Sequence, residues 1–305
     1  MDVDPLSARV LAAVAEHGTL DAAARSLHIT PSAVSQRLKQ LEQQVGRRLL
    51  IRSRPVRLTP EGRAVVRFAQ RQQLLEHELR ADLGLAQDHA GARLTIAVNS
   101  DSLATWFLRA VAEVTAEHPV QIELLREDQD GTARLLGEGE AVAAVTSAAQ
   151  PPAGCSSTAL GQLSYRAMAA PAWWERWAGD GAQDGRTPSA DMLARAPRID
   201  FDRTDVLQAQ WLRGRGVDPA AAPVHHVPST HELAVAVELG MGWAMLLEDQ
   251  ARELEGRGAA IGLGGPAVVT PLYWQAVRTP STLLDALTEA VVAAGRRELA
   301  AAALS

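Results

Sequence analysis

One segment near the amino end, residues 20–42, constrains the fold more than any other part of the chain. Thr19 is a good amino-terminal helix cap, and apolar residues recur after it at helical spacing as far as Leu27. Thr30 then caps a second helix whose first position is Pro31, where a missing N–H group costs nothing. The segment therefore predicts two helices joined by a tight turn.

The second of these helices has one apolar face and one polar face. Its apolar stripe runs from Ala33 to Val45, and hydroxyls, amides and cations stand on the other side. A helix that reads DNA needs hydroxyls and amides for base edges and cations for phosphates. An ordinary solvated helix could show such a face, but it would not explain the turn and the caps. We expect base contacts from Thr30, Ser32, Ser35 and Gln36 and a phosphate contact from Arg37, with Pro31 and Lys39 completing the DNA-binding set.

A basic segment follows the two helices. Residues 46–62 alternate apolar residues with arginines and predict a short β-hairpin, or wing. Between His28 and Arg57, seven lysines and arginines stand against one acid, Glu42, whereas the whole chain has a net charge of −6. Such a polarised distribution suits phosphate binding by one end of an acidic protein. We expect the wing to add phosphate contacts from Arg48, Arg52 and Arg54.

Composition excludes several other classes of protein. The chain has 305 residues with 47% hydrophobic content, which suggests two or three domains. No apolar run reaches membrane-spanning length, and the acidic start is unlike a signal peptide. The single cysteine, Cys155, excludes an intrachain disulfide. We therefore expect a cytoplasmic protein without a membrane partner, metal or cofactor, and nothing in the sequence supports catalysis.

The sequence pattern divides the chain into three regions. Residues 1–58 form the DNA-binding domain, which an amphipathic helix from Asp4 to His17 completes. Residues 59–90 contain a helix, expected to reach about Gln87, and a short hinge. A helix of that length is expected to pack on its counterpart in another subunit. Residues 91–305 form a two-lobed α/β domain, with lobe I at about 91–165 and 269–305 and lobe II at about 166–268, joined by crossover strands near Arg166 and Val269.

Alternating strands and helices define the two-lobed region. A βαβαβ order implies a parallel sheet with right-handed crossovers in the first lobe. Its predicted strands are 94–98, 120–126 and 141–147, and its predicted helices are 102–117 and 132–136. Another strand is expected at 163–169, before the second lobe. That lobe is expected to contain elements at 173–178, 189–195, 198–201, 205–214, 232–239 and 242–247, followed by a strand at 268–278 that returns to the first lobe and a helix at 281–303. Residues 262–265 are expected to form a loop.

The first sixty residues resemble the LysR-type transcriptional regulators, and the similarity continues over essentially the whole chain. Residues 98–106, 127–130, 137–146 and 242–243 resemble the branch of basic-amino-acid regulators, which controls lysine and arginine export and includes inhibitors of chromosome initiation. The resemblance implies an α+β multidomain protein with a winged helix-turn-helix, a long linker helix and an effector domain like that of periplasmic binding proteins. It also implies a homodimer or homotetramer that binds double-stranded operator DNA and a small-molecule effector, with RNA polymerase as a further candidate partner.

Candidate effector-binding residues follow from that resemblance and from strand ends. Ligands of such sheets bind at the carboxyl ends of strands, here in the cleft between the lobes. Asn99, Ser100 and Ser102 are placed to hold an amino-acid carboxylate, although Ser100 or Asp101 could equally cap the helix. A basic side chain would also need anions, and four aspartates near strand ends are available, each of which could instead be solvated. The expected effector-binding set is Asn99, Ser100, Ser102, Asp128, Thr146, Asp202, Asp205, Ser229 and Glu232, with Asp130 as the fourth aspartate.

One departure from the branch concerns its ligand. The branch usually has a glutamate where His231 stands here, so the charge for a ligand amino group would have to come from Glu232 or elsewhere. The sequence nevertheless predicts a sequence-specific regulator of a basic amino acid exporter gene, which responds to lysine or arginine through a change in the angle between the lobes. The alternatives are a sequence-tolerant binder at the nucleoid or replication origin and a LysR-type regulator with another effector. A binding protein or enzyme built on the two lobes would leave the first sixty residues unexplained.

Overall fold

The computed structural model describes residues 3–51, 53–84, 92–127, 129–178 and 187–299. The chain divides into two compact units. Unit 1 contains Met1–Asn99, Trp106–Ala159 and Tyr273–Ala294, and unit 2 contains Ser100–Thr105, Leu160–Leu272 and Gly295–Ser305. Within the described residues, no helix is both long and apolar enough to cross a membrane.

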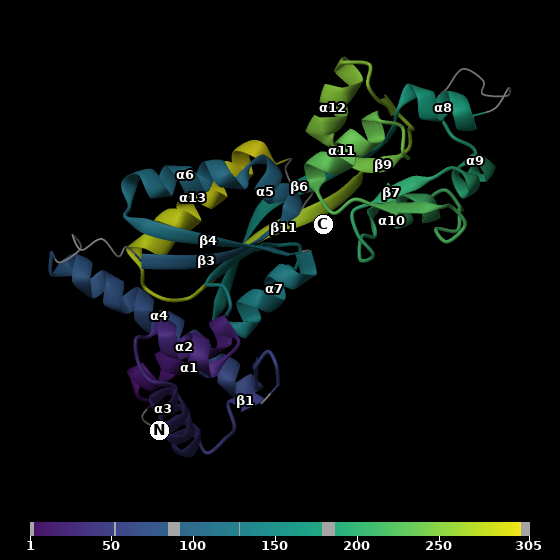
Figure 1. The fold of residues 1–305 in the computed structure, drawn as a ribbon. Coiled ribbons are helices and arrows are strands. Elements are labelled where there is room, and N and C mark those ends of the chain that lie inside the picture. The colour runs from purple at the N-terminus through teal and green to yellow at the C-terminus, as the bar shows by residue number, and fades with distance from the viewer. Residues whose placement is uncertain (1–2, 52, 85–91, 128, 179–186, 300–305) are drawn as a thin grey trace. The chain divides into compact units, whose positions relative to one another are not determined.

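The amino-terminal part of unit 1 is a winged helix-turn-helix (Figure 1). The hydroxyl of Thr19 accepts the N–H of Ala22, and the hydroxyl of Thr30 accepts the N–H of Ala33, so both predicted caps are present. Apolar side chains from all three helices form one buried core beneath them. The elements are α1 (Pro5–His17), α2 (Leu20–Ser26), α3 (Pro31–Val45), β1 (Leu50–Ile51) and β2 (Arg57–Leu58).

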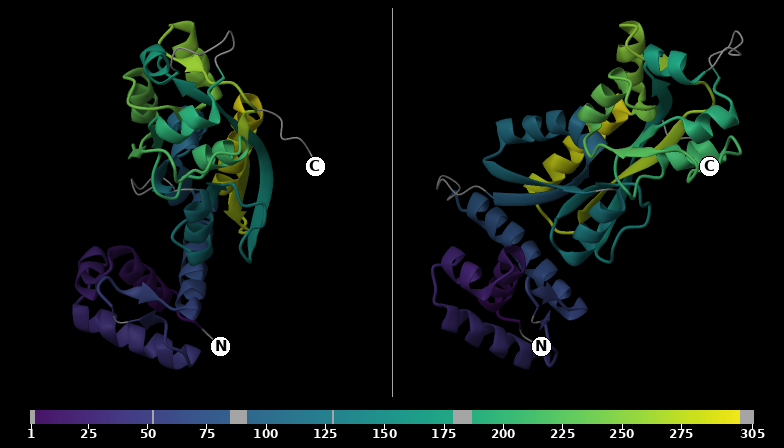
Figure 2. Two further views of the ribbon diagram at one scale, coloured as in Figure 1. Left: turned by 90° about the vertical axis from the view of Figure 1, so that its right-hand side faces the viewer. Right: turned by 45° about the vertical axis from the view of Figure 1, so that its right-hand side comes forward.

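A single long helix, α4 (Pro60–Asp82), follows the wing and is continuous in the right-hand view of Figure 2. It ends earlier than predicted, because Leu83 and Gly84 form a turn in which Gly84 has φ +68°. One side of α4 donates hydrogen bonds to backbone carbonyls of unit 1, including one of 3.1 Å from Arg71 Nη2 to Gly154 O. Another side leaves large apolar residues exposed, namely Phe68 (40%), Leu75 (47%) and Leu79 (57%), with Leu83 (62%) just beyond the helix.

The rest of unit 1 is a mixed sheet with flanking helices. Strand β3 pairs in parallel with β4 and β5, as the βαβαβ pattern predicts, and β11 returns to pair antiparallel with β5. The predicted helix at 102–117 is wrong in one respect, since the chain breaks at Trp106 into two helices that belong to different units. The elements are β3 (Ala92–Asn99), α6 (Phe107–Glu117), β4 (Val120–Glu127), α7 (Gln129–Glu138), β5 (Ala143–Thr146), β11 (Val268–Val277) and α13 (Thr282–Glu298).

Unit 2 contains the whole of the predicted second lobe and also the short helix α5 (Ser100–Thr105), which the sequence placed in the first. Strand β6 pairs antiparallel with β9 and β10, and β7 pairs in parallel with β8. Both β6 and β11 begin in one unit and end in the other. The elements are β6 (Cys155–Ala169), α8 (Pro171–Trp177), α9 (Ala190–Arg195), β7 (Arg198–Asp200), α10 (Leu207–Arg213), β8 (Val224–His226), α11 (Thr230–Glu238), β9 (Ala244–Leu247), α12 (Glu248–Gly256) and β10 (Ile261–Gly262).

Three elements of unit 2 escaped the sequence pattern. Strands β8 and β10 have three and two residues, too few to show a period. Helix α12 has only Ala251 and Leu254 buried among charged residues, so its apolar stripe is thin. The expected loop at 262–265 is wrong at its first residue, since Gly262 pairs with Met168.

Candidate DNA interface and effector site

The exposed face of α3 carries the side chains expected to read DNA. Ser32, Ser35, Gln36 and Lys39 are all exposed, and their spacing of three or four residues places them on one side of the helix. Val34, Leu38 and Leu41, on the other side, are buried in the helix-turn-helix core. The face that remains free therefore offers two hydroxyls, an amide and a cation.

The first turn of α3 is fixed by its cap. The hydroxyl of Thr30 accepts the N–H of Ala33 at 3.2 Å and lies 2.9 Å from the hydroxyl of Ser32. Pro31 occupies the first helical position and is exposed. The hydroxyl of Thr30 thus holds the helix end in place, which orients Ser32.

Arg37 lies at the margin of the exposed face. One of its nitrogens is 3.9 Å from the carboxylate of Asp4, at the start of α1. A hydrogen bond from the Ser7 hydroxyl is the main cause that holds the pKa of Asp4 below its usual value, so this carboxylate is a persistent anion. The pair is solvent-exposed and weak, which leaves Arg37 able to exchange Asp4 for a phosphate.

The wing presents arginines, whereas the single acid of this region points inward. The carboxylate of Glu42 accepts the N–H of Leu49 at 2.8 Å, which connects the end of α3 to the wing. Arg48 and Arg54 are exposed, and the hydroxyl of Thr59 donates to the carbonyl of Arg48 at 2.8 Å. The predicted contact Arg52 lies outside the described residues. The surface between α3 and the wing is therefore basic.

In unit 1, two of the predicted effector residues lie at the same edge of the sheet. The β3–β5 register pairs Ala97 with Ala144, and continued by two residues it brings Asn99 level with Thr146. Asn99 is 2% exposed and Thr146 is fully buried, and the hydroxyl of Thr146 accepts the N–H of Ala148. The predicted residue Asp128 and the side chain of Asp130 lie outside the described parts of the chain.

Gln275 was not predicted, yet its side chain reaches the turn that follows this edge. It is fully buried on β11, and its Nε2 donates to the carbonyl of Ala148 at 2.6 Å. The hydroxyl of Thr146 contacts the N–H of the same residue, Ala148, so two side chains hold this turn. A lone glutamine in a late strand carries no sequence signal for such a position.

In unit 2, helices α5 and α11 bring further candidates near each other. Ser100 is half-buried and Ser102 is fully buried on α5. At the start of α11, the hydroxyl of Ser229 donates to the carboxylate of the exposed residue Glu232. Asp101 does not act as a simple helix cap, because its carboxylate accepts the hydroxyls of two residues far away in sequence.

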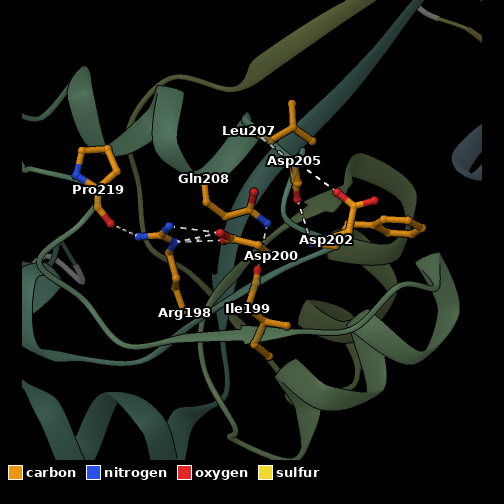
Figure 3. Close-up of polar contacts among 9 residues, drawn as sticks. Arg198, Ile199, Asp200, Asp202, Asp205, Leu207, Gln208 and Pro219 are labelled. Carbon is orange, nitrogen blue, oxygen red and sulfur yellow. Dashed lines mark hydrogen bonds and ion pairs between the residues drawn. The ribbon is translucent and has the colours of Figure 1, made fainter. Parts of the chain in front are cut away.

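Asp202 and Asp205 lie in the turn after β7 (Figure 3). Asp202 Oδ1 accepts the N–H and hydroxyl of Thr204, and although burial opposes them, these bonds leave the pKa of Asp202 below its usual value. Both oxygens of Asp205 accept backbone N–H groups, one from Phe201 and one from Leu207. Burial raises the pKa of Asp205. Asp202 is therefore the better anion of the two.

A buried ion pair that the sequence did not reveal stands beside this turn. Arg198 Nε and Nη2 donate to the two oxygens of Asp200 at 2.9 and 3.0 Å, and both side chains are only 8% exposed. Arg198 Nη1 also donates to the carbonyl of Pro219, and Gln208 Nε2 donates to that of Ile199 at 2.8 Å (Figure 3). The two charged residues share one strand, β7, so alternation along it was the only available sequence signal.

Comparisons with known proteins agree with this arrangement. Residues 7–63 match the bacterial regulatory helix-turn-helix proteins of the lysR family, and residues 87–300 match the LysR substrate binding domain. The lysine export transcriptional regulatory protein LysG of Corynebacterium efficiens is 40% identical over 97% of this chain and 99% of its own length.

Two solved structures are similar over nearly the full length. The crystal structure of ArgP from Mycobacterium tuberculosis has a TM-score of 0.86 and 36% identity, covering 99% of this chain and all of that one. Full-length LysG from Corynebacterium glutamicum with bound effector Arg has a TM-score of 0.78 and 35% identity, covering 98% of this chain and all of that one. Because this chain matches both the helix-turn-helix and the substrate binding domain of the family, it belongs to the LysR family of bacterial helix-turn-helix transcription regulators.

Proposed function

We propose that this regulator binds arginine or lysine and controls the gene of a basic amino acid exporter. The observation that carries the proposal is its similarity, over 98% of the chain, to a LysG structure with arginine bound. A second relative, 40% identical, is a lysine export regulator. A regulator of this kind acts on chromosomal DNA in the cytoplasm, where RNA polymerase at the promoter is its further partner.

The chemistry of the described residues suits an amino acid with a cationic side chain. Asn99, Ser100, Ser102 and Thr146 supply the polar groups proposed to hold the α-carboxylate. Asp202 supports the cation best, because its pKa is lowered and it is only half-buried. Glu232 is exposed beside His231 on α11 and can supply the second charge that the branch usually takes from position 231.

Two further acids are weaker candidates for the cation. The oxygens of Asp205 hold backbone N–H groups and its pKa is raised, so it stabilises the turn better than it serves as an anion. The charge of Asp200 is already neutralised by Arg198. The proposal therefore places Asp202 and Glu232 ahead of Asp205 in the ligand-binding set.

The assembly proposed for DNA binding is a dimer or tetramer held in part by α4. Phe68, Leu75 and Leu79 lie on one face of this helix at spacings of seven and four residues, and all three are exposed. An exposed apolar stripe on a long helix favours packing against the same helix of a second subunit. Two recognition helices would then contact two half-sites of one operator.

Calorimetric titration of the full-length protein with matched amino acids tests the effector. Arginine and lysine are expected to bind. Citrulline and norleucine, which keep the carboxylate and lose the cation, are expected to bind at least about tenfold more weakly, as is agmatine, which lacks the carboxylate. Equal affinity for citrulline and arginine would remove Asp202 and Glu232 from the proposed role.

Anisotropy titrations with DNA test the regulatory role. The protein is expected to prefer the intergenic DNA upstream of its own gene over a shuffled sequence of equal length by at least about 10³-fold at physiological salt. Equal binding to both DNAs would favour the sequence-tolerant nucleoid or origin binder instead.

A further inference from the structure

Helix α5 belongs to a different unit from the chain on either side of it. Strand β3 and helix α6, its neighbours in sequence, are parts of unit 1, whereas residues 100–105 cluster with unit 2. The chain therefore passes from one unit to the other at Asn99–Ser100 and back at Thr105–Trp106. Of the residues proposed to hold the effector carboxylate, Asn99 lies before the first of these joints, and Ser100 and Ser102 lie after it.

Asp101 connects α5 to other elements of unit 2. Its Oδ2 accepts the hydroxyl of Tyr165 at 2.6 Å, and its Oδ1 accepts the hydroxyl of Thr230 at 2.8 Å. Tyr165 is on β6 and Thr230 is the first residue of α11, so one carboxyl connects three elements. Gln250 of α12 donates to the carbonyl of Thr230 at 3.1 Å, which extends the connection to a fourth element.

The partners of Asp101 are held firmly. Tyr165 is 2% exposed and Thr230 is 8% exposed, so neither hydroxyl is on a mobile surface side chain. Because each carboxyl oxygen of Asp101 already has a hydroxyl donor, this residue is suited to hold α5 in place rather than to bind the ligand itself.

We propose that Asp101 is a positioning residue for the effector response, which makes the carboxylate-binding segment Ser100–Ser102 move together with α11 and β6. This inference rests on the proposed function, because it assumes an amino acid bound at the segment. When the effector binds, its carboxylate contacts Ser100 and Ser102, and the Asp101 connection passes that constraint to β6 and α11. When this connection is lost, Ser100 and Ser102 are still present, but their side chains are no longer held in a fixed orientation toward the ligand.

Substitutions that delete single hydroxyls test the proposal in the full-length protein. Tyr165→Phe and Thr230→Val each remove one donor to Asp101 and keep the side-chain shape, and Thr230→Ser keeps the donor. Thr288→Val is the matched control, because the Thr288 hydroxyl accepts the indole N–H of Trp274 at 3.0 Å within unit 1, whereas Asp101, Tyr165 and Thr230 all belong to unit 2. Each protein is measured for its arginine Kd by calorimetry, its melting temperature, and its affinity for the upstream DNA with and without saturating arginine.

We expect Tyr165→Phe and Thr230→Val to weaken arginine binding about tenfold each, the loss that follows from one hydrogen bond to a charged group. The effect of arginine on DNA affinity should fall in the same variants, while DNA affinity without arginine stays within about twofold of wild type, because the recognition helix is untouched. Thr230→Ser should restore the wild-type Kd. Thr288→Val should lose thermal stability without changing the arginine Kd.

Two outcomes overturn the proposal and are distinguishable. In the first outcome, the wild-type protein binds arginine, and Tyr165→Phe and Thr230→Val have its arginine Kd and its change of DNA affinity. The same conclusion follows if their arginine affinity falls only in proportion to their melting temperature and Thr288→Val shows the same proportion. Asp101 then has a structural role alone. If the wild-type protein binds neither arginine nor lysine, the proposed function itself fails, and the role of Asp101 in that response fails with it.

Discussion

The buried ion pair between Arg198 and Asp200 makes a quantitative prediction. Both side chains are 8% exposed, and two guanidinium nitrogens donate to the two carboxylate oxygens at 2.9 and 3.0 Å. Asp200→Asn keeps the shape and removes the charge, which leaves the Arg198 guanidinium buried without its counterion. Breaking a buried pair in this way costs about 3–5 kcal/mol. At about 2–4 °C per kcal/mol for a protein of this size, the melting temperature should fall by about 6–20 °C.

Urea unfolding and thermal melts of matched variants measure this effect. Asp191→Asn is the control, because the Arg195–Asp191 pair has a 2.6 Å contact but side chains that are 64% and 79% exposed. That substitution should change the free energy of unfolding by less than about 0.5 kcal/mol. The double variant Arg198→Met/Asp200→Leu should recover most of the lost stability, since no charge then remains buried.

The double variant also separates stability from ligand binding. Because Arg198 neutralises Asp200, we expect this variant to bind arginine with wild-type affinity. An Asp200→Asn protein that unfolds at the wild-type urea midpoint would refute the reasoning, because it would mean that the pair is solvated. A folded double variant with no arginine affinity would show that Asp200 contacts the ligand.

Three further predictions concern DNA binding, assembly and pH. Gln36→Ala should weaken binding to the upstream DNA by about 1–3 kcal/mol without changing the slope of log K against log salt, whereas Arg48→Ala should reduce that slope by about 1; an unchanged slope would remove Arg48 from the phosphate contacts. Leu79→Asp puts a charge on the exposed apolar face of α4 and should shift the protein toward monomer in light scattering, while Gln73→Asp on another face should not; a Leu79→Asp protein that stays oligomeric would exclude this face as the interface. Burial raises the pKa of Asp101 above 3.8, so the folded state holds more protons than the unfolded state between 3.8 and the folded pKa, and the free energy of unfolding should fall as pH rises through that window. Asp101→Asn should remove that component from urea titrations made across the window, and parallel pH profiles for the two proteins would contradict the shift.

Local sequence signals were sufficient for the DNA-binding domain. The caps at Thr19 and Thr30 and the apolar stripe of α3 act over a few residues, and the structure forms both helices where these signals place them. The βαβαβ order likewise predicted the parallel pairing of β3 with its two neighbours. Local signals failed at β8, which is too short to show a hydrophobic period. They also failed at Trp106, where the amphipathic pattern continues although the helix is interrupted.

A helix-turn-helix, a wing, a linker helix and an alternating α/β region can all be predicted from the amino-acid sequence of this chain, because caps and hydrophobic periods are local properties. The roles of its acids become visible only in the folded structure. Asp200 is neutralised by Arg198, Asp205 holds backbone N–H groups, and Asp101 reaches partners 64 and 129 residues away. The role of a carboxylate depends on the donors and the burial around it. Folding sets the burial of all three acids and orients the nearby donors of Asp200 and Asp205, and it brings the donors of Asp101 from distant parts of the chain.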